Sequence, residues 1–345
     1  MMNATLRPGR MSWITDPRSR RLLVLLALAA VAAAIPAAAS PYAVGLTTRF
    51  VVFSILALSM DLLWGYGGVV SFGHAMFFGL GAYAAAITLS HLTGVSGTYL
   101  AFVIGIGVPS LLALGLGFFL FYSAVAGVYF GIVTLALSVV FETLAVVSRD
   151  FTGGMDGLYG FAIPTIWLPG LGNVEIWGTE NPYIVSVVGL AVCFGLARWI
   201  TRSSFGIAIR AIRDDEARLE LLGYNTAFLK TVLLVITCAM AGLAGTLYTT
   251  VGFVSPQLLG VFFSTQVLVW VGIGGRGTLV GPILGTILVG FLETILSGEY
   301  ENIWPLFVGL FFLAIVLFWP RGLYPFLERG AVAVRRFRRT PEATG

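Results

Sequence analysis

The chain has 345 residues, of which 58% are hydrophobic and only 10% are charged, and it carries a formal net charge of +4. A soluble domain of this length needs far more charge on its surface, so the composition excludes a soluble globular protein and indicates a membrane protein. Both cysteines, Cys193 and Cys238, lie in apolar segments. They are expected as small buried side chains and not as a disulfide pair.

Apolar runs recur along the chain, and most are long enough to cross about 30 Å of hydrocarbon as a helix. The expected crossings are 22–40, 47–65, 73–91, 98–121, 125–147, 183–200, 229–251, 261–274, 278–297 and 303–319. The predicted fold class is therefore all-α, a polytopic integral membrane protein with about ten transmembrane helices and a transmembrane domain at 22–320.

The first of these runs also has the features of a secretory signal peptide. Arg18, Arg20 and Arg21 precede the apolar run, and small residues follow it at 37–40. Cleavage is therefore an alternative to a retained first crossing. Retention is expected, because the run reaches spanning length and the topology requires it.

Basic residues cluster in three regions, namely residues 1–21, the loop at 201–228 and the tail at 321–345. The positive-inside rule places all three regions in the cytoplasm. Six crossings before the loop and four after it satisfy this rule, with both termini cytoplasmic. The tail is expected to lie near anionic lipid headgroups.

The stretch SFGHAMFFGLGAYAAA at 71–86 places a histidine in an otherwise apolar segment. Gly65, Gly67 and Gly68 precede it and predict an interrupted helix. We expect His74 to be a neutral imidazole bonded to a backbone carbonyl where the helix resumes. Irregular backbone inside a membrane is tolerated only where protein covers it or water reaches it, so 71–81 is expected at an interhelical or pathway surface.

Small and polar residues recur at helical spacing in the fifth and ninth crossings, so each set shares one helix face. Such a face either lines a transport pathway, with its glutamate at the periplasmic mouth, or packs helix against helix. We favour the pathway. The expected pathway residues are Ser71, His74, Thr134, Ser138, Glu142, Thr286 and Glu293.

The loop at 149–182 is the largest one predicted on the periplasmic side, and four acidic residues in it outnumber one arginine. Its FTGGMDGLYG and LPGLGN stretches are typical of turns. We therefore expect an outer cap or docking surface without a folded domain.

The cytoplasmic loop at 201–228, TRSSFGIAIRAIRDDEARLELLGYNTAF, is too patterned for a simple connection. Asp214 or Asp215 can cap a helix with Glu216 in its first turn, and Gly223 can end it in the left-handed conformation. Asp214 and Arg218 are spaced for an i,i+4 ion pair.

An apolar patch of Ile207, Ala211 and Ile212 lies just ahead of this helix. A short cytoplasmic helix with such a patch and mixed charges fits a groove on a soluble partner protein. The alternative is that the arginines only fix the topology.

Two nucleotide-binding patterns are excluded. The GIGGRG sequence at 272–277 has dinucleotide-binding spacing, but membrane spans flank it, so its glycines are expected to form a tight turn. Lys230 is the only lysine of the chain and follows TAFL, so a phosphate-binding loop is excluded and energy must come from another subunit or an ion gradient. No metal site, cofactor or nucleic-acid partner is expected.

Two other function classes remain for comparison. Ser71 and His74 are three residues apart, but nucleophilic catalysis also needs an oxyanion site and a base held in position, so an intramembrane enzyme is disfavoured. A proton-coupled secondary carrier is the stronger alternative, because His74, Glu142 and Glu293 are able to relay protons.

Several stretches together resemble the inner-membrane permease subunits of bacterial ABC importers for branched-chain amino acids. They are DLLWGYGGVVSFGHAMFFGLGAYAAA, FTGGMDGL, FGIAIRAIRDDEARLELLGYNT, GGRGTLVGPILGT and FWPRGL, spread over roughly residues 50–324. The resemblance implies a ten-helix permease with a second related permease, two cytoplasmic ATPase subunits and a periplasmic binding protein as partners. Some of these stretches also resemble the urea and short-chain amide permeases of the same family.

The resemblance further implies that residues 204–224 are the segment that contacts the ATPase. The expected coupling residues are Ser204, Phe205, Gly206, Arg210, Arg213, Asp214, Asp215, Glu216 and Gly223. The expected function is therefore half of a pathway for leucine, isoleucine or valine, which alternates between outward-open and inward-open states as the partners bind ATP.

Overall fold

The structure is a computed structural model that describes residues 39–123, 127–170 and 172–299, together with single positions between 306 and 313. The basic segment 1–21, the predicted first and last crossings and the tail at 321–345 lie outside the described residues, apart from these few positions.

A helix occupies each of the remaining eight predicted crossings. These helices are α2 (Pro41–Asp61), α3 (His74–His91), α4 (Gly94–Tyr122), α5 (Val128–Val147), α7 (Glu180–Arg202), α10 (Thr226–Tyr248), α11 (Val261–Gly274) and α12 (Val280–Glu299). Five of them, α2, α4, α5, α7 and α10, are long and apolar enough to cross a membrane. The chain is thus a mostly helical, multi-pass membrane protein, as its composition predicts.

Shorter elements fill the connections. They are the π-helical turn η2 (Leu62–Tyr66), α6 (Arg149–Thr152), η3 (Gly154–Asp156), β1 (Leu158–Tyr159), β2 (Thr165–Leu168), β3 (Gly172–Glu175), α8 (Ser204–Asp214), α9 (Glu216–Leu221), η4 (Thr249–Val251), β4 (Phe253–Val254) and η5 (Pro256–Leu259). They correct two expectations, an outer loop made only of turns and a single helix in the cytoplasmic loop.

The outer loop contributes three strands to two antiparallel strand pairs, and β4, which follows α10, contributes the fourth. β2 pairs with β3 as a hairpin, with Thr165 opposite Glu175. β1 pairs with β4. The all-α prediction is therefore incomplete, because the described part of the fold also contains four short strands. The TIWL sequence of β2 is rich in β-branched and aromatic residues, but strands of two to four residues are too short to produce a recognisable alternating pattern.

Helix α10 lies at the centre of the bundle and packs most extensively against α4 and α3, and also against α2. Glycines allow this close approach. A Cβ atom at Gly81 of α3 would meet backbone atoms of Gly242 in α10 and Gly105 in α4. Small residues at such crossings are typical of helices that associate in membranes.

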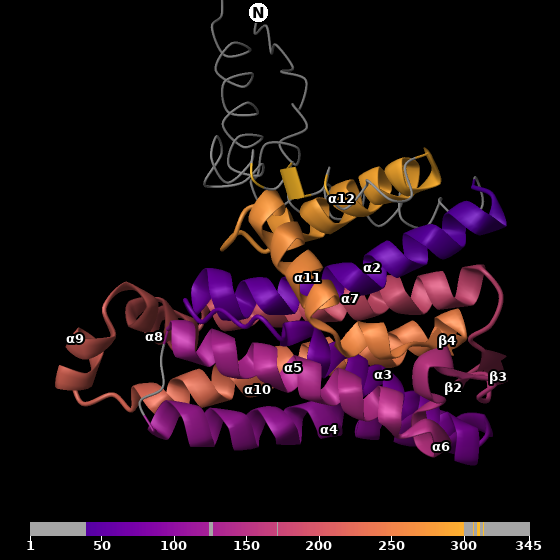
Figure 1. Ribbon diagram of the computed structural model, residues 1–345, viewed down its shortest axis with the longest axis horizontal. Helices are drawn as coiled ribbons and strands as arrows, with labels where there is room; N and C mark the ends of the chain where they lie inside the picture. Colours follow the sequence, from indigo (N-terminus) through magenta and orange to yellow (C-terminus); the bar gives the residue numbers. More distant parts are fainter. Residues whose placement is uncertain are drawn as a thin grey trace, which may run out of the picture.

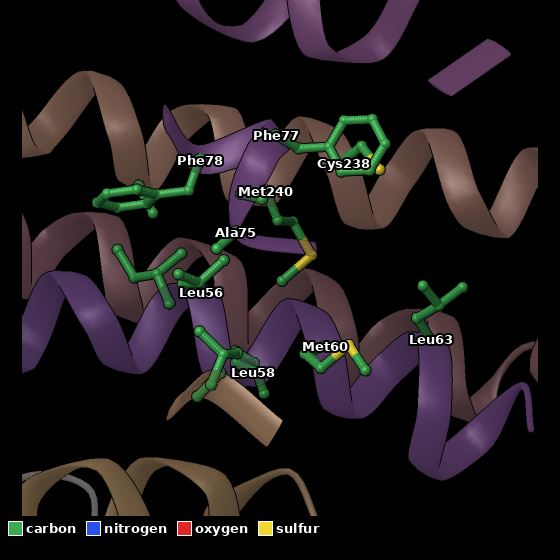
Figure 2. Packing of buried hydrophobic residues seen from close by; sticks show 14 of the residues in the cluster. Leu56, Leu58, Met60, Leu63, Ala75, Phe77, Phe78, Cys238 and Met240 are labelled. Carbon is green, nitrogen blue, oxygen red and sulfur yellow. The ribbon is translucent and has the colours of Figure 1, made fainter. Parts of the chain in front are cut away.

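One buried cluster joins these helices, and Figure 2 shows side chains of α2, α3 and α10 within it. Aromatic rings extend the cluster to α11. The ring of Phe53 in α2 stacks on Tyr248 of α10 at 5.7 Å and on Trp270 of α11 at 5.3 Å, measured between ring centroids. The short helix α11 is therefore anchored in the core by its rings.

Helices α8 and α9 lie at one end of the bundle, and α6 and the strands lie at the other end (Figure 1). The loops at 149–182 and 201–228 thus lie on opposite sides of the bundle, as the charge distribution predicts.

We expect the close packing at Gly105 to be essential for stability. Its Cβ position is occupied by Thr246 and by the Gly81 carbonyl, whereas nothing lies within 4 Å of the Cβ position at Gly107, on the same helix. Gly105→Val should lower the free energy of unfolding by about 1–3 kcal/mol, measured by thermal unfolding in detergent. Gly107→Val is the matched control and should behave like the wild type. Equal losses in the two variants would contradict the prediction.

Candidate functional site

The chain between α2 and α3 is irregular, as the glycines predict. Helix α2 ends in the π turn η2, residues 67–73 are not helical, and α3 begins at His74. Gly68 has a φ of +72°, which favours glycine. At Gly73 a Cβ atom would collide with the Thr134 carbonyl of α5. This irregular segment is therefore covered by α5 and lies at an interhelical surface.

His74 is fully buried, and its hydrogen-bond partner differs from the predicted backbone carbonyl. Its Nε2 lies 2.9 Å from the Ser59 hydroxyl of α2. Since that hydroxyl donates its proton to the Leu56 carbonyl at 2.7 Å, the imidazole N–H must be the donor to Ser59. Among the described residues, His74 Nδ1 and the Ser71 hydroxyl have no hydrogen-bond partner. This arrangement fits a neutral imidazole.

Irregular backbone covers Thr134 and Ser138 on the polar face of α5, whereas Glu142 is half-buried. The Thr134 hydroxyl accepts from Phe72 N at 3.2 Å, and the Ser138 hydroxyl donates to the Leu259 carbonyl of η5. The Glu142 carboxylate lies against the backbone of Gly260. In this conformation the stripe therefore forms a packed seam.

The polar face of α12 is arranged in the same way. Thr286 is buried and donates to the Pro282 carbonyl at 2.8 Å. Glu293 is half-buried and accepts a hydrogen bond from Gln266 of α11 at 2.5 Å. The sequence reasoning missed Gln266, although an amide in an otherwise apolar short helix is a usable signal. Both glutamates of the predicted stripes therefore lie beside α11 or the residue that caps it, Gly260.

The loop at 201–228 contains one more helix than predicted. Ser203 caps α8 by accepting from Gly206 N at 3.3 Å. Arg210 then holds α8 against α7 through a hydrogen bond to the Thr201 carbonyl at 3.2 Å. Gly206 leaves no room for a side chain, because a Cβ atom there would collide with the Ile200 carbonyl. These contacts fix the direction in which α8 leaves the bundle.

Helix α9 confirms the predicted caps but not the predicted ion pair. Asp215 caps it by accepting from Arg218 N at 3.1 Å, and Gly223 follows it with a φ of +86°. Arg218 pairs with Asp215 at 3.4 Å, whereas Asp214 pairs with Arg213 at 3.1 Å. The i,i+4 pair of Asp214 and Arg218 is therefore wrong, because α8 ends between them and the helical spacing is lost.

The predicted apolar patch is also divided. Ile212 is buried against the bundle, whereas Ile207 is exposed on another face of α8. Leu221, Leu222 and Tyr224 are exposed nearby in α9 and just after it, with Leu221 as much as 89% exposed. The exposed apolar surface of this unit thus extends over both helices.

A buried ion pair attaches α9 to the bundle. Lys230, at the start of α10 and only 7% exposed, bonds to Glu216 of α9 and lies 5.6 Å above the ring of Phe121 in α4. Glu216, predicted as a coupling residue, is therefore engaged within this chain.

The last residue of α2 and the turn η2 that follows it connect α8 with the loop between α11 and α12. Arg213 of α8 donates to the Gly65 carbonyl at 2.7 Å. Asp61, which is fully buried, accepts from Gly277 N at 2.5 Å and from Leu279 N at 3.1 Å. We call this junction the α2 joint and define it by Asp61, Gly65, Arg213, Gly277 and Leu279.

The loop at the α2 joint has the tight geometry that the GIGGRG sequence predicts. Gly275 and Gly277 have φ values of +113° and +75°, and Leu279 has a φ of +59°. The role of Asp61 was missed, although a single acid in an apolar helix indicates a buried partner. Within the described part of the chain, no group of three or more His, Cys, Asp or Glu residues is arranged to hold a metal ion.

Residues 42–318 match the family described as the permease component of branched-chain amino acid transport systems. The chain is similar to the high-affinity branched-chain amino acid permease protein LivM of Escherichia coli K12, with 27% identity over 327 residues that cover 89% of this chain and 75% of that protein. It is also similar to the corresponding protein BraD of Pseudomonas aeruginosa, with 26% identity over 79% of this chain and 91% of BraD. No solved structure matches the chain.

We expect the Asp61 carboxylate to stabilise the α2 joint. Asp61→Ala removes the acceptor of two buried backbone N–H groups and should lower the free energy of unfolding by about 3 kcal/mol. Asp61→Asn keeps an acceptor oxygen and should lose less. Thermal unfolding of the purified chain measures both, with the exposed Asp150→Ala as control. The prediction is wrong if Asp61→Ala and Asp150→Ala unfold at the same temperature.

Proposed function

The chain belongs to the family of branched-chain amino acid permease components, and from this membership we propose that it forms half of the pathway of an ATP-driven importer for leucine, isoleucine and valine. It is a transport subunit and not an enzyme, because the family is a permease component. The names of the relatives favour amino acids over urea or short-chain amides as the solute.

The observation that carries the proposal is the α8–α9 unit. It lies at one end of the bundle, outside the five spans long enough to cross a membrane, and it exposes apolar side chains. Such a surface fits a groove on a soluble protein. Two cytoplasmic ATPase subunits, one of them docked on this unit, are the partners that we propose. A proton-coupled carrier has no use for such a docking surface.

The proposed coupling residues have two different roles. Ser204, Arg213, Asp214, Asp215 and Gly223 are exposed and are available to the ATPase. A second set, with buried or half-buried side chains, shapes the unit from within. Its members are Phe205, Gly206, Arg210 and Glu216. Movement of the ATPase would reach the bundle through the hydrogen bond from Arg213 to the α2 joint.

Further partners follow from the relatives and the fold. Escherichia coli K12 has two relatives of this chain, LivM and LivH, and both are named permease proteins of a high-affinity branched-chain amino acid transport system. This supports a second, related permease as partner. We place a periplasmic binding protein at the end that carries the strands. The assembly would lie in the bacterial inner membrane, with ten crossings at 22–320 and with 1–21 and 321–345 in the cytoplasm.

We further propose that the seams on α5 and α12 form the pathway when they open. Thr134, Ser138 and Thr286 are buried here, so this conformation presents a closed pathway at these positions. Glu142 and Glu293 are half-buried toward the strand end of their helices, where water would reach them. Ser71 and His74 lie on the irregular segment that covers the α5 seam.

The docking proposal is tested by placing charge on the apolar surface. Leu221→Glu with Leu222→Glu should reduce solute-stimulated ATPase activity at least about tenfold in the reconstituted transporter, because burying an unpaired carboxylate costs several kcal/mol. Leu221→Met with Leu222→Met is the matched control, because it changes the same two exposed positions but keeps them apolar and of similar volume. Normal stimulation in the double variant would refute docking at this surface.

The pathway proposal is tested by the reactivity of cysteines. Ser138→Cys and Thr286→Cys should react with small water-soluble thiol reagents only during ATP turnover, because both positions are covered in the closed state. Leu135→Cys, on the exposed apolar face of α5, should stay unreactive in a lipid bilayer. If all three positions stay unreactive throughout the cycle, the seams serve only helix packing.

A further inference from the structure

A cavity of about 460 Å³ opens at the strand end of the bundle. It lies between the first turns of α2, the residues before α7 and the turn that follows α10, and none of the pathway residues discussed above lines it. Its volume is in the range of small-molecule binding sites. In Figure 1 the start of α2, the start of α7 and the last turn of α10 lie at the same end of the bundle as the strands.

Arg49 is the only charged residue in the described part of the cavity lining. It is also the only charged residue of α2 before Asp61, in a helix that is otherwise apolar. Among the described residues, no hydrogen bond or ion pair engages its guanidinium. A cationic side chain inside an apolar span usually faces a water-filled cavity or an anionic partner. The cavity therefore offers an arginine that is free to bind an anion.

The rest of the lining suits a small zwitterion. Leu46 and Trp177 provide apolar surface. The hydroxyls of Thr48 and Thr250 donate to helix carbonyls at 2.8 and 2.7 Å, so their oxygens remain able to accept from an ammonium group. None of the described lining residues is acidic, so these residues offer a purely cationic ligand only the repulsion of Arg49.

We propose that this cavity binds the carboxylate of an amino-acid solute at the outer end of the permease, with Arg49 as its ligand. The proposal rests on the proposed function, because that function supplies the solute. Arginine matches a carboxylate with two parallel N–H donors. The same oxyanion chemistry is available from a phospholipid phosphate, because Arg49 lies about two turns inside α2 and its side chain is long enough to reach the headgroup region. The experiment must separate these two sources.

The first arm measures the charge preference of the cavity. In the purified full chain, Thr179→Cys places a thiol in the lining without removing a proposed ligand group, and both native cysteines are buried. An anionic methanethiosulfonate should react faster than a cationic one, and Arg49→Gln should lower this ratio about tenfold. Arg202→Gln, an exposed arginine at the opposite end of α7, is the matched control and should leave the ratio unchanged. Arg49→Lys should keep the preference, because it keeps the charge.

The second arm identifies the ligand. Leucine should slow the labelling of Thr179→Cys, whereas 3-methylbutylamine, which lacks the carboxylate, should not. Protection by leucine should weaken about tenfold in Arg49→Gln and less in Arg49→Lys. If phosphatidylglycerol nanodiscs suppress labelling by the anionic reagent and leucine gives no protection, the site belongs to lipid phosphate and the proposal is overturned. The proposal is also overturned if Arg49→Gln leaves the ratio of the anionic to the cationic reaction rate unchanged.

Leucine uptake by the complete transporter keeps this test separate from the proposed function. If the wild-type complex imports leucine while Arg49→Gln alters neither labelling nor protection, the carboxylate site is refuted and the function stands. If the wild-type complex imports no branched-chain amino acid, the proposed function fails, and with it the identity of the solute in this cavity.

Discussion

The need to satisfy backbone polar groups inside the membrane determines most of this architecture. Hydrocarbon offers no hydrogen bonds, so each break in a helix needs a partner from a neighbouring element. At the break before α3, the Thr134 hydroxyl accepts from Phe72 N, and the Ser264 hydroxyl accepts from Ala75 N at 3.2 Å. At the break before α11, the Ser138 hydroxyl donates to the Leu259 carbonyl. The hydroxyl stripes are where they are because interrupted helices pack against them.

The same constraint accounts for the α2 joint. In the loop between α11 and α12, the N–H groups of Gly277 and Leu279 point away from the loop carbonyls, and the Asp61 carboxylate accepts from both. Its charge is compensated by backbone dipoles in place of a basic side chain. The seams and the joint thus share one solution, in which short polar side chains complete irregular backbone and link distant segments.

Much of this could be predicted from the sequence, because the signals are local. Hydropathy predicts the long helices, Gly65 to Gly68 predict the interruption, and Asp215 and Gly223 predict the ends of α9. The partners of His74, Ser138 and Asp61 could not be predicted, because they depend on segments that are far apart along the chain. Ser138 and Leu259 are separated by 121 positions, and Asp61 and Leu279 by 218. The strands were missed because they are too short to produce a pattern.

The contact at Gly65 also bears on how related chains diverge. Its missing side chain leaves the space that the Asp61 carboxylate and the Gly277 backbone occupy. A mutation that adds a side chain at 65 displaces both groups, and one that removes the acid leaves the loop without its acceptor. We therefore expect homologues to keep positions 61, 65 and 277 together or to replace all three with a loop of different length.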